Sequence, residues 1–328
     1  MRIRHSLLFI ALLTAHHAYA SCGSTACSIN TNWDEHSASQ PGLSMDLRYS
    51  YSQADQLRSG SSKIAADTTF AGEVENLKTV NKITTIGIDY TFDEHWGMAL
   101  NAPFVSREHN HNLGPYTGST SAGSETFSTN AMGDSKVIAR YRWTLNEANH
   151  SSIGIKLGMK LNTGRQDALI VDNLGASKLP TEVTLQTGSG STDYIVGAFW
   201  QQADPASSLS WFAQALSQSA LSNRADFKPG DQFNVDAGLR YAFSKSCNGL
   251  LQINSQLNTA DTGSNAALTA AGKTSTGGNS VSITPGVSYA VMTGTNVYGL
   301  LQLPLYQYVN GEQLTTGSAA TLGINHRF

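Results

Sequence analysis

Apolar and polar side chains alternate along many segments of this chain, with a period of two residues. The clearest segment is 152–162, and its apolar positions are Ile153, Ile155, Leu157, Met159 and Leu161. The positions between them are Lys156, Gly158, Lys160 and Asn162. Successive side chains of a β-strand point to opposite faces, so the segment predicts a strand with one apolar and one polar face.

About twelve such segments can be found, each near the roughly ten residues of a membrane-spanning strand. They lie near 43–52, 78–92, 95–106, 133–144, 152–162, 191–202, 208–219, 232–243, 251–257, 279–291, 295–309 and 320–328. A soluble β-sandwich would alternate too. Strand length and aromatic residues near the strand ends favour a membrane barrel with interfacial girdles. These aromatic residues are Tyr51, Tyr90, Trp96, Trp143, Trp200 and Tyr289.

The first twenty residues have the pattern of an export signal. Arg2 and Arg4 precede the apolar run from Leu7 to Leu13, and Ala18-Tyr19-Ala20 forms a cleavage site. The run is too short to span a bilayer. Residues 1–20 are therefore predicted to be a signal peptide, followed by an N-terminal segment over 21–42 and a barrel over 43–328.

Composition and the last residue agree with a barrel in the bacterial outer membrane. Only 14% of the residues are charged, whereas a soluble protein usually has about a quarter. A membrane barrel accounts for the difference, because its outer face is apolar and its loops are rich in small polar residues. The chain ends in an aromatic residue, Phe328, on an amphipathic segment. The net charge of -3 indicates no nucleic-acid partner.

The connections alternate in length, which predicts an even number of strands with both termini in the periplasm. Long connections lie near 53–77, 107–132, 163–190, 220–230 and 259–278. Short ones lie near 93–94, 146–149, 203–206, 244–248 and 293–294. Long loops of such barrels face outside and short turns face the periplasm. Asn310-Gly311 is the exception, and it predicts a tight type I′ turn on the outer side.

Three cysteines are predicted to meet on the periplasmic side. Cys22 and Cys27 lie in the N-terminal segment, and Cys247 lies in a short turn. An oxidising compartment favours one disulfide among them, with Cys22–Cys27 or a bond to Cys247 left open. The N-terminal segment itself fits either a plug inside the lumen or a periplasmic tail.

Positive charges gather on the predicted inner face of two neighbouring strands. They are Lys136, Arg140, Arg142, Lys156 and Lys160. A wall of five cations would favour anionic solutes. The alternative is a packed lumen in which these cations pair with inward acids and nothing passes. Those acids are Asp46, Asp89, Asp193 and Asp236.

Other chemistry is weakly indicated. His109 and His111 point to one side of a strand and could share a metal ion, or could simply line a wet loop. No cofactor motif is present, and no nucleophile motif indicates an enzyme. A hydrolase at the barrel rim would need His150 or His326 within hydrogen-bond reach of a serine.

Several short motifs resemble the outer-membrane family described as the MetA-pathway of phenol degradation group, which is related to long-chain fatty acid transporters. They are the stretches 303–307, 309–314 and 323–328, Asn101 to Val105, the His109/His111 pair and Gly133-Asp134. The resemblance implies a small barrel that passes small, often aromatic or apolar, compounds. It implies no catalytic residue.

The sequence thus predicts an all-β outer-membrane channel that passes a small solute, anionic or aromatic, by diffusion. Its partners would be outer-membrane lipid and the solute. The alternative is a plugged structural barrel that holds a periplasmic or extracellular protein, such as a redox partner.

Overall fold

The structure is a computed structural model of the chain. It describes residues 41–328 except 66–74, 114–122, 172–177, 181, 205, 265–268, 271–272 and 275. The predicted signal peptide and nearly all of the predicted N-terminal segment, with Cys22 and Cys27, lie outside these residues. No helix in the described part of the chain is long and apolar enough to cross a membrane.

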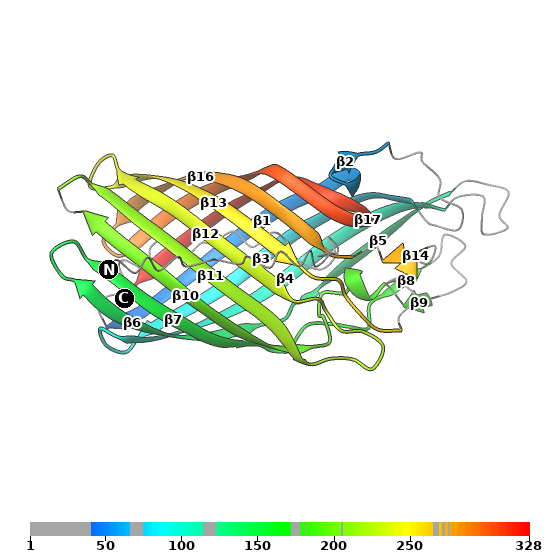
Figure 1. Ribbon diagram of the computed structural model, residues 1–328, viewed down its shortest axis with the longest axis horizontal. Helices are drawn as coiled ribbons and strands as arrows, with labels where there is room; N and C mark the ends of the chain where they lie inside the picture. The colour runs from blue at the N-terminus through cyan, green and yellow to red at the C-terminus, as the bar shows by residue number, and fades with distance from the viewer. Residues whose placement is uncertain are drawn as a thin grey trace, which may run out of the picture.

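Eleven assigned strands form a closed antiparallel barrel (Figure 1). They are β1 (Gly42–Gly60), β3 (Glu75–Thr91), β4 (Trp96–Leu113), β6 (Lys136–Asn146), β7 (Ser151–Lys160), β10 (Thr192–Asp204), β11 (Leu209–Ser222), β12 (Gln232–Ala242), β13 (Cys247–Asn258), β16 (Gly278–Met292) and β17 (Thr295–Arg327). Each pairs with the next in this order, and β17 pairs with β1 to close the ring. Closure leaves the wall without a free edge.

The last assigned strand crosses the wall twice. Its first part, up to Val309, is antiparallel to β16, and the part from Glu312 is antiparallel to β1. Because β1 and β16 run in opposite directions around the alternating ring, β17 must reverse between these parts. The wall therefore has twelve antiparallel crossings, in agreement with the expected strand number.

The turn within β17 differs from the predicted type. A type I′ turn needs positive φ at both central residues, but only Gly311 has one, at 52°. A single left-handed glycine is the signature of a type I turn followed by a G1 bulge. The type I′ prediction from Asn310-Gly311 is therefore wrong.

The two faces of the wall separate as the alternation predicts. On β7, Ile153 and Leu157 are 43% and 53% exposed, whereas Lys156 and Lys160 are 3% and 6% exposed. The exposed apolar side chains cover the outside, where lipid would replace water, and the polar ones fill the inside. Exposed aromatic residues concentrate where the strands meet their short turns. They include Tyr90, Phe92, Trp96, Trp143, Tyr241, Phe243, Tyr289 and Phe328.

The two ends of the barrel differ. Short connections lie at one end, together with Gly42 and Phe328, whose amide donates to the Leu43 carbonyl at 2.9 Å. We call this the turn end. All the longer connections lie at the other, the loop end (Figure 1).

Several strands continue past the predicted limits at the loop end. β1 reaches Gly60, and a short strand, β2 (Ser62–Lys63), folds back against it. β5 (Gly123–Met132) pairs with the loop-end half of β4, inside a segment predicted to be loop. Both faces of these arms are rich in polar residues, so they lack the alternation that marks the membrane strands.

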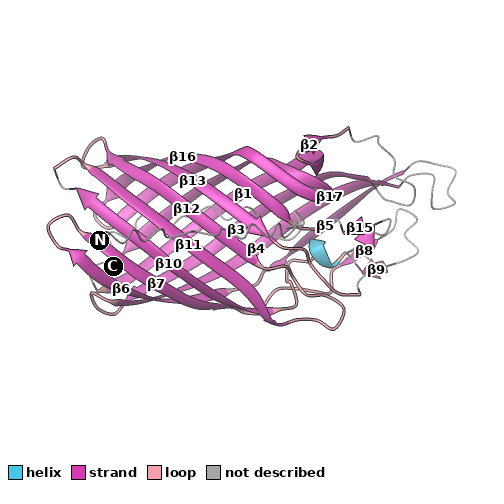
Figure 2. Cartoon of the chain, in the orientation of Figure 1, coloured by secondary structure: helices cyan, strands magenta, loops and turns pink. Residues whose placement is uncertain are grey.

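The longest connection also contains structure of its own. Residues 161–191, which we call the β7–β10 loop, carry β8 (Leu169–Val171), β9 (Lys178–Pro180) and the 3-10 helix η3 (Val183–Leu185). A further pair, β14 (Thr269–Ala270) and β15 (Lys273–Thr274), lies between β13 and β16. Figure 2 shows the helix beside the loop end of β5.

Candidate functional site

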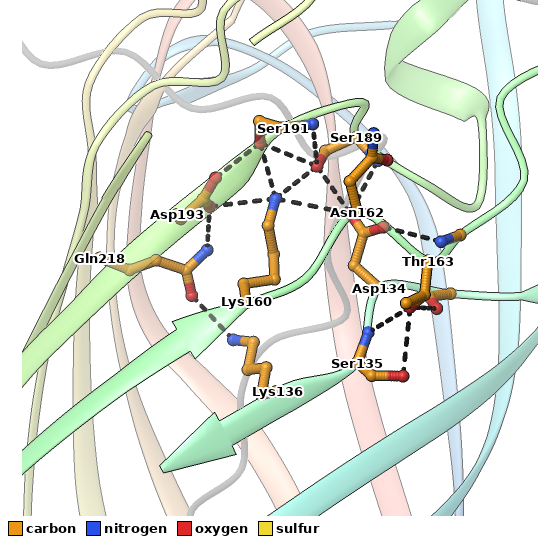
Figure 3. A network of polar contacts seen from close by, with 12 residues as sticks. Asp134, Ser135, Lys136, Lys160, Asn162, Thr163, Ser189, Ser191, Asp193 and Gln218 are labelled. Atoms are coloured by element: carbon orange, nitrogen blue, oxygen red, sulfur yellow. Dashed lines mark hydrogen bonds and ion pairs between the residues drawn. The ribbon is translucent and has the colours of Figure 1, made fainter. Parts of the chain in front are cut away.

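A buried lysine gathers carboxylates and hydroxyls inside the loop end of the barrel (Figure 3). Lys160 is the last residue of β7, and Asp193 points inward from the neighbouring β10. The Lys160 Nζ lies 3.0 Å from Asp193 Oδ2 and 3.4 Å from Asp134 Oδ2. It also donates to the Ser191 hydroxyl at 2.8 Å and to the Ser189 hydroxyl. We call these five residues the Lys160 network.

Asp134 fastens the β7–β10 loop to the wall. Its Oδ1 accepts the Gly164 amide at 2.9 Å, and its Oδ2 accepts the amide and hydroxyl of Ser189 at 2.9 and 2.6 Å. The loop backbone comes together at this point, since a Cβ on Gly164 would lie 2.5 Å from the Cα of Gly188. One carboxylate thus holds both ends of the loop beside Lys160.

A second lysine joins the network through a glutamine. The Lys136 Nζ donates to Gln218 Oε1 at 2.9 Å, and Gln218 Nε2 donates to Asp193 Oδ2 at 2.7 Å. The Ser191 hydroxyl donates to Asp193 Oδ1 at 2.6 Å. Asp193 therefore has several fixed donors, which stabilises a carboxylate removed from water.

The middle of the β7–β10 loop is anchored on β4, two strands away from β7 in the wall. Arg107, which is 2% exposed, points inward from β4 and donates to Asn81 Oδ1 at 2.7 Å. Its Nη1 also donates to the carbonyls of Thr184 and Gln186 at 3.4 and 3.1 Å. Leu185 packs against Phe127 on the inner face of β5. The loop therefore lies against the inside of the wall and narrows the loop end.

A second charged cluster lies at the turn end. The Arg140 guanidinium forms a bidentate pair with Asp89, with Nη2 to Oδ1 at 2.8 Å, and donates to the Thr91 hydroxyl at 2.7 Å. The Arg142 guanidinium donates to the Glu94 carbonyl at 2.6 and 3.0 Å. Such fork-shaped contacts hold the cations at defined places on the wall.

Lys156 occupies the middle of the same wall. Its Nζ donates to Gln214 Oε1 at 3.1 Å and lies 5.1 Å from the centre of the Phe199 ring, within cation–π range. Gln214 Nε2 donates to Asp236 Oδ2 at 2.8 Å. A polar ladder thus runs from Lys156 across β11 to β12.

The five predicted wall cations therefore all lie on the inner face of β6 and β7, as the alternation indicated. Each is held by at least one polar partner. The sequence also named Asp89, Asp193 and Asp236 as inward acids, and these three side chains accept the contacts described above.

The wall across the ring from β6 and β7 carries an apolar group among buried polar side chains such as Gln252 and Thr284. Leu250 of β13 packs with Tyr298 and Leu300 of β17, and Phe212 joins them from β11. The Tyr298 hydroxyl donates to Asp46 Oδ2 at 2.7 Å. The lumen is therefore lined by cations along β6 and β7, and across the ring by this apolar and aromatic group together with polar side chains.

The weak metal candidate gains no support from its surroundings. His109 is buried, and its Nδ1 lies 2.8 Å from the Thr79 hydroxyl. The side chain of His111 lies outside the described residues. Across the described chain, no group of three or more His, Cys, Asp or Glu side chains could hold a metal ion. Cys247 is half-buried and has no disulfide partner among the described residues, and the pairing with Cys22 and Cys27 stays a prediction.

The rim histidines do not form the arrangement that a hydrolase needs. The His326 Nδ1 lies 2.7 Å from the hydroxyl of Thr295, a threonine rather than a serine. His150 is exposed in a short turn with a φ of 46°. Within the described residues, neither histidine has a serine hydroxyl as a hydrogen-bond partner.

Sequence reasoning missed the residues that hold the loop. Arg107 alternates with Val105 and His109, so its inward direction could have been found from the pattern. Ser189 and Ser191 lie in a segment rich in glycine, serine and threonine, and no local signal marks them. Asp134 appeared only as part of a family motif, and its role depends on contacts across many residues.

Burial also perturbs one carboxylate in the connections at the loop end. Asp261 accepts the Gly230 amide at 2.8 Å through Oδ1, whereas its buried Oδ2 has no hydrogen-bond partner in the described structure. Burial raises the pKa of Asp261 from 3.8 to about 6. The charged form is therefore disfavoured in this buried position, and the folded connection around the Gly230 amide loses stability as pH rises from about 4 to 6, although the hydrogen bond itself favours the carboxylate.

We expect the Gly230 amide to exchange at least about tenfold faster at pH 7.5 than at pH 4.5, after correction for intrinsic rates. One pKa unit corresponds to about 1.4 kcal/mol, which sets this scale. Hydrogen exchange followed by mass spectrometry measures it. The Asp261→Asn variant keeps the acceptor and should lose the pH dependence. Equal corrected protection at both pH values in the wild type would contradict the prediction.

Comparison with known proteins supports the fold. No family model and no curated protein matches the chain. Among solved structures, it is similar to the COG4313 outer membrane channel from Pseudomonas putida F1, with a TM-score of 0.64 and 12% identity over 88% of this chain and 96% of that one.

Two further structures are more distant. The NanC porin has a TM-score of 0.45 and 10% identity, over 87% of this chain and 100% of that one. A Pseudomonas aeruginosa FadL homologue has a TM-score of 0.43 and 9% identity, over 87% and 90%. Both scores are too low to add to the comparison. The closed wall, its apolar outer face and the first similarity together establish an outer-membrane β-barrel.

Proposed function

We propose that the protein is an outer-membrane channel that passes a small solute by diffusion, with a preference for anions that carry an aromatic or apolar part. The turn end, with Gly42 and Phe328, faces the periplasm, and the loop end faces outside. This orientation follows the rule that outer-membrane barrels have short periplasmic turns and longer outer loops. The motifs similar to the MetA-pathway group imply the aromatic or apolar part of such a solute, and the lumen cations imply its negative charge.

The excess of positive charge inside the barrel carries the proposal. Among the described residues, and not counting Arg327 at the turn-end rim, the inward cations are Arg48, Arg107, Lys136, Arg140, Arg142, Lys156, Lys160 and Arg240, and the inward carboxylates are Asp46, Asp89, Asp134, Asp193 and Asp236. Eight cations against five carboxylates leave an excess of three. A positive lumen with apolar surroundings attracts anions and repels small cations.

The arrangement of the lining suggests how an amphiphilic anion would pass. Cations fixed along β6 and β7 offer contacts from Arg142 near the turn end to Lys136 near the loop end. Across the ring, the group around Leu300 and Phe212 offers an apolar surface. A solute with a carboxylate and a ring could contact both sides at once, whereas a neutral sugar would gain little from either. Passage requires weak contacts at several places rather than one tight site.

One observation favours a second function, a closed structural barrel. Lys160 pairs with two buried carboxylates, and Arg140 and Arg48 each pair with one. Together with the inward β7–β10 loop, these bridges could close the lumen permanently. The protein would then hold a periplasmic or extracellular protein partner in place of passing a solute.

Removing lumen charge while keeping hydrogen bonds tests the proposed filter. The Lys136→Gln/Lys156→Gln variant lowers the excess of positive charge from three to one, and the amides can still donate to Gln218 and Gln214. We expect the anion preference, measured as a reversal potential under a salt gradient, to fall to near zero.

The matched control is Lys82→Gln. Lys82 is exposed and points outward from β3, so the same chemical change occurs on the other side of the wall. Its reversal potential should equal that of the wild type. If the double variant and the control select ions equally, the lumen cations are not the filter.

A further inference from the structure

A groove on the outside of the barrel lies at the loop end, where β1, β2 and the two arms of β17 meet. It is lined by Gln56, Arg58, Lys63, Gly317 and the stretch 303–307. Leu303 and Leu305 are 38% and 62% exposed, and they alternate with the inward Leu300 and Gln302 earlier in the strand. The groove therefore opens toward the surrounding membrane, not toward the lumen. Figure 1 shows β2 beside the loop end of β17.

Two cations stand side by side above the apolar part of this groove. Arg58 and Lys63 are directly opposite each other in the β1–β2 pair, so their side chains leave the sheet on the same face. Lys63 is exposed and makes no polar contact with the described residues. Arg58 is held in place, since its Nη1 donates to the Ser61 carbonyl at 2.6 Å and its Nε to the Thr315 hydroxyl at 3.3 Å.

Neither cation forms an ion pair with a carboxylate among the described residues. Two carboxylates lie near the groove without lining it: Asp55, which accepts Gln53 Nε2 at 2.6 Å and lies close to Gly317, and Glu312, which is paired with Ser59. The described lining of the groove contains two cations and no carboxylate, so its upper part is positive. Directly below it, Leu303, Leu305 and the 46% exposed Tyr306 present an apolar surface.

We propose that this groove binds lipid A, a phosphorylated glycolipid of the outer leaflet. An amphiphile of this class has phosphates that match Arg58 and Lys63 and acyl chains that match the leucines below. Arginine suits phosphate because its planar fork can bind two oxygens at once. Tyr306 lies between the two regions, as interfacial tyrosines do. The inference rests on the proposed orientation and goes beyond the proposed channel function.

The floor of the groove offers a test that leaves the charges in place. Gly317 has no positive φ, and a Cβ there would meet only the Asp55 carboxylate, at an ordinary 3.6 Å. The Gly317→Leu variant should therefore fold and fill the groove. The Asp55→Asn variant removes the neighbouring negative charge and should tighten phosphate binding.

Native mass spectrometry of the full mature protein with bis-phosphorylated lipid A measures binding. We expect Arg58→Gln/Lys63→Gln and Gly317→Leu each to weaken affinity at least about tenfold, and Asp55→Asn to strengthen it. The control is Lys228→Gln, an exposed loop-end lysine outside the groove, with unchanged affinity. Heat-modifiable migration on gels checks that each variant folds. If the double variant does not fold, the Arg58→Lys variant, which keeps the positive charge but removes the planar fork, is measured in its place.

Three results would overturn the proposal. The first is that the double variant binds lipid A as tightly as the wild type does. The second is that lipid A stripped of phosphate binds as tightly as intact lipid A. The third is that millimolar inorganic phosphate alone displaces lipid A, which would assign the cations to free phosphate. Cysteine labelling of a Ser61→Cys variant on intact cells checks orientation separately. Labelling only after permeabilisation would contradict the orientation, whatever the result with purified protein.

Discussion

The Lys160→Met variant is expected to lose about 3–5 kcal/mol of unfolding free energy, because it leaves Asp134 and Asp193 buried without their cation. The side chains of these two carboxylates are only 8% and 4% exposed. Methionine has nearly the shape of lysine but cannot donate to either carboxylate or to Ser189 and Ser191. Urea unfolding in detergent, followed by tryptophan fluorescence, measures the loss.

Two comparison variants separate charge from shape. Lys160→Met/Asp193→Asn removes one carboxylate together with the lysine, and we expect it to recover about half of the lost stability. Lys82→Met makes the same replacement on the outward face and should change stability by less than about 0.5 kcal/mol. If Lys160→Met is as stable as the wild type, the Lys160 network does not stabilise the loop end.

The Arg107→Ala variant is expected to release the β7–β10 loop from the wall and raise single-channel conductance about twofold or more. The guanidinium is the donor to the carbonyls of Thr184 and Gln186, and it also fixes Asn81. Without it, these buried carbonyls lose their hydrogen-bond donor, at a cost of about 1–3 kcal/mol of free energy. They regain hydrogen bonds when the loop moves toward water. The loop end of the lumen would then widen.

Planar-bilayer recordings measure this effect. Arg165→Ala is the control, because Arg165 belongs to the same loop but is 50% exposed and pairs with an exposed carboxylate, Asp167. Exposed pairs contribute little, so its conductance should match the wild type. Conductance unchanged in Arg107→Ala would show that this anchor does not control the width of the pore.

The membrane strands could be predicted because the bilayer imposes a strict rule on every second residue. In 152–160 the outward residues are apolar and the inward ones are lysine or small, and the structure has the same two faces. The arms beyond the wall, such as β5, obey no such rule. Their faces meet water or a loop, so their composition carries no periodic signal.

The residues of the candidate site also divide into those that the alternation predicts and those that it does not. The inward direction of Lys156 and Lys160 follows from alternation alone. The partners of Lys160 do not, because Asp134 and Ser189 are 26 and 29 positions away in the chain, Asp134 at the margin of a predicted strand and Ser189 in a connection without a pattern. The turn at Asn310-Gly311 was found by its sequence, but its backbone type depends on how β16 and β1 pair with the two arms.

The reversal potential of the refolded, mature wild-type protein in a planar bilayer, under a salt gradient, tests the central claim most directly. An open lumen with an excess of three positive charges predicts discrete conductance steps with a reversal potential on the anion side. Steps that favour cations would contradict the proposed filter. A folded protein that never conducts would contradict the channel itself and favour the closed structural barrel.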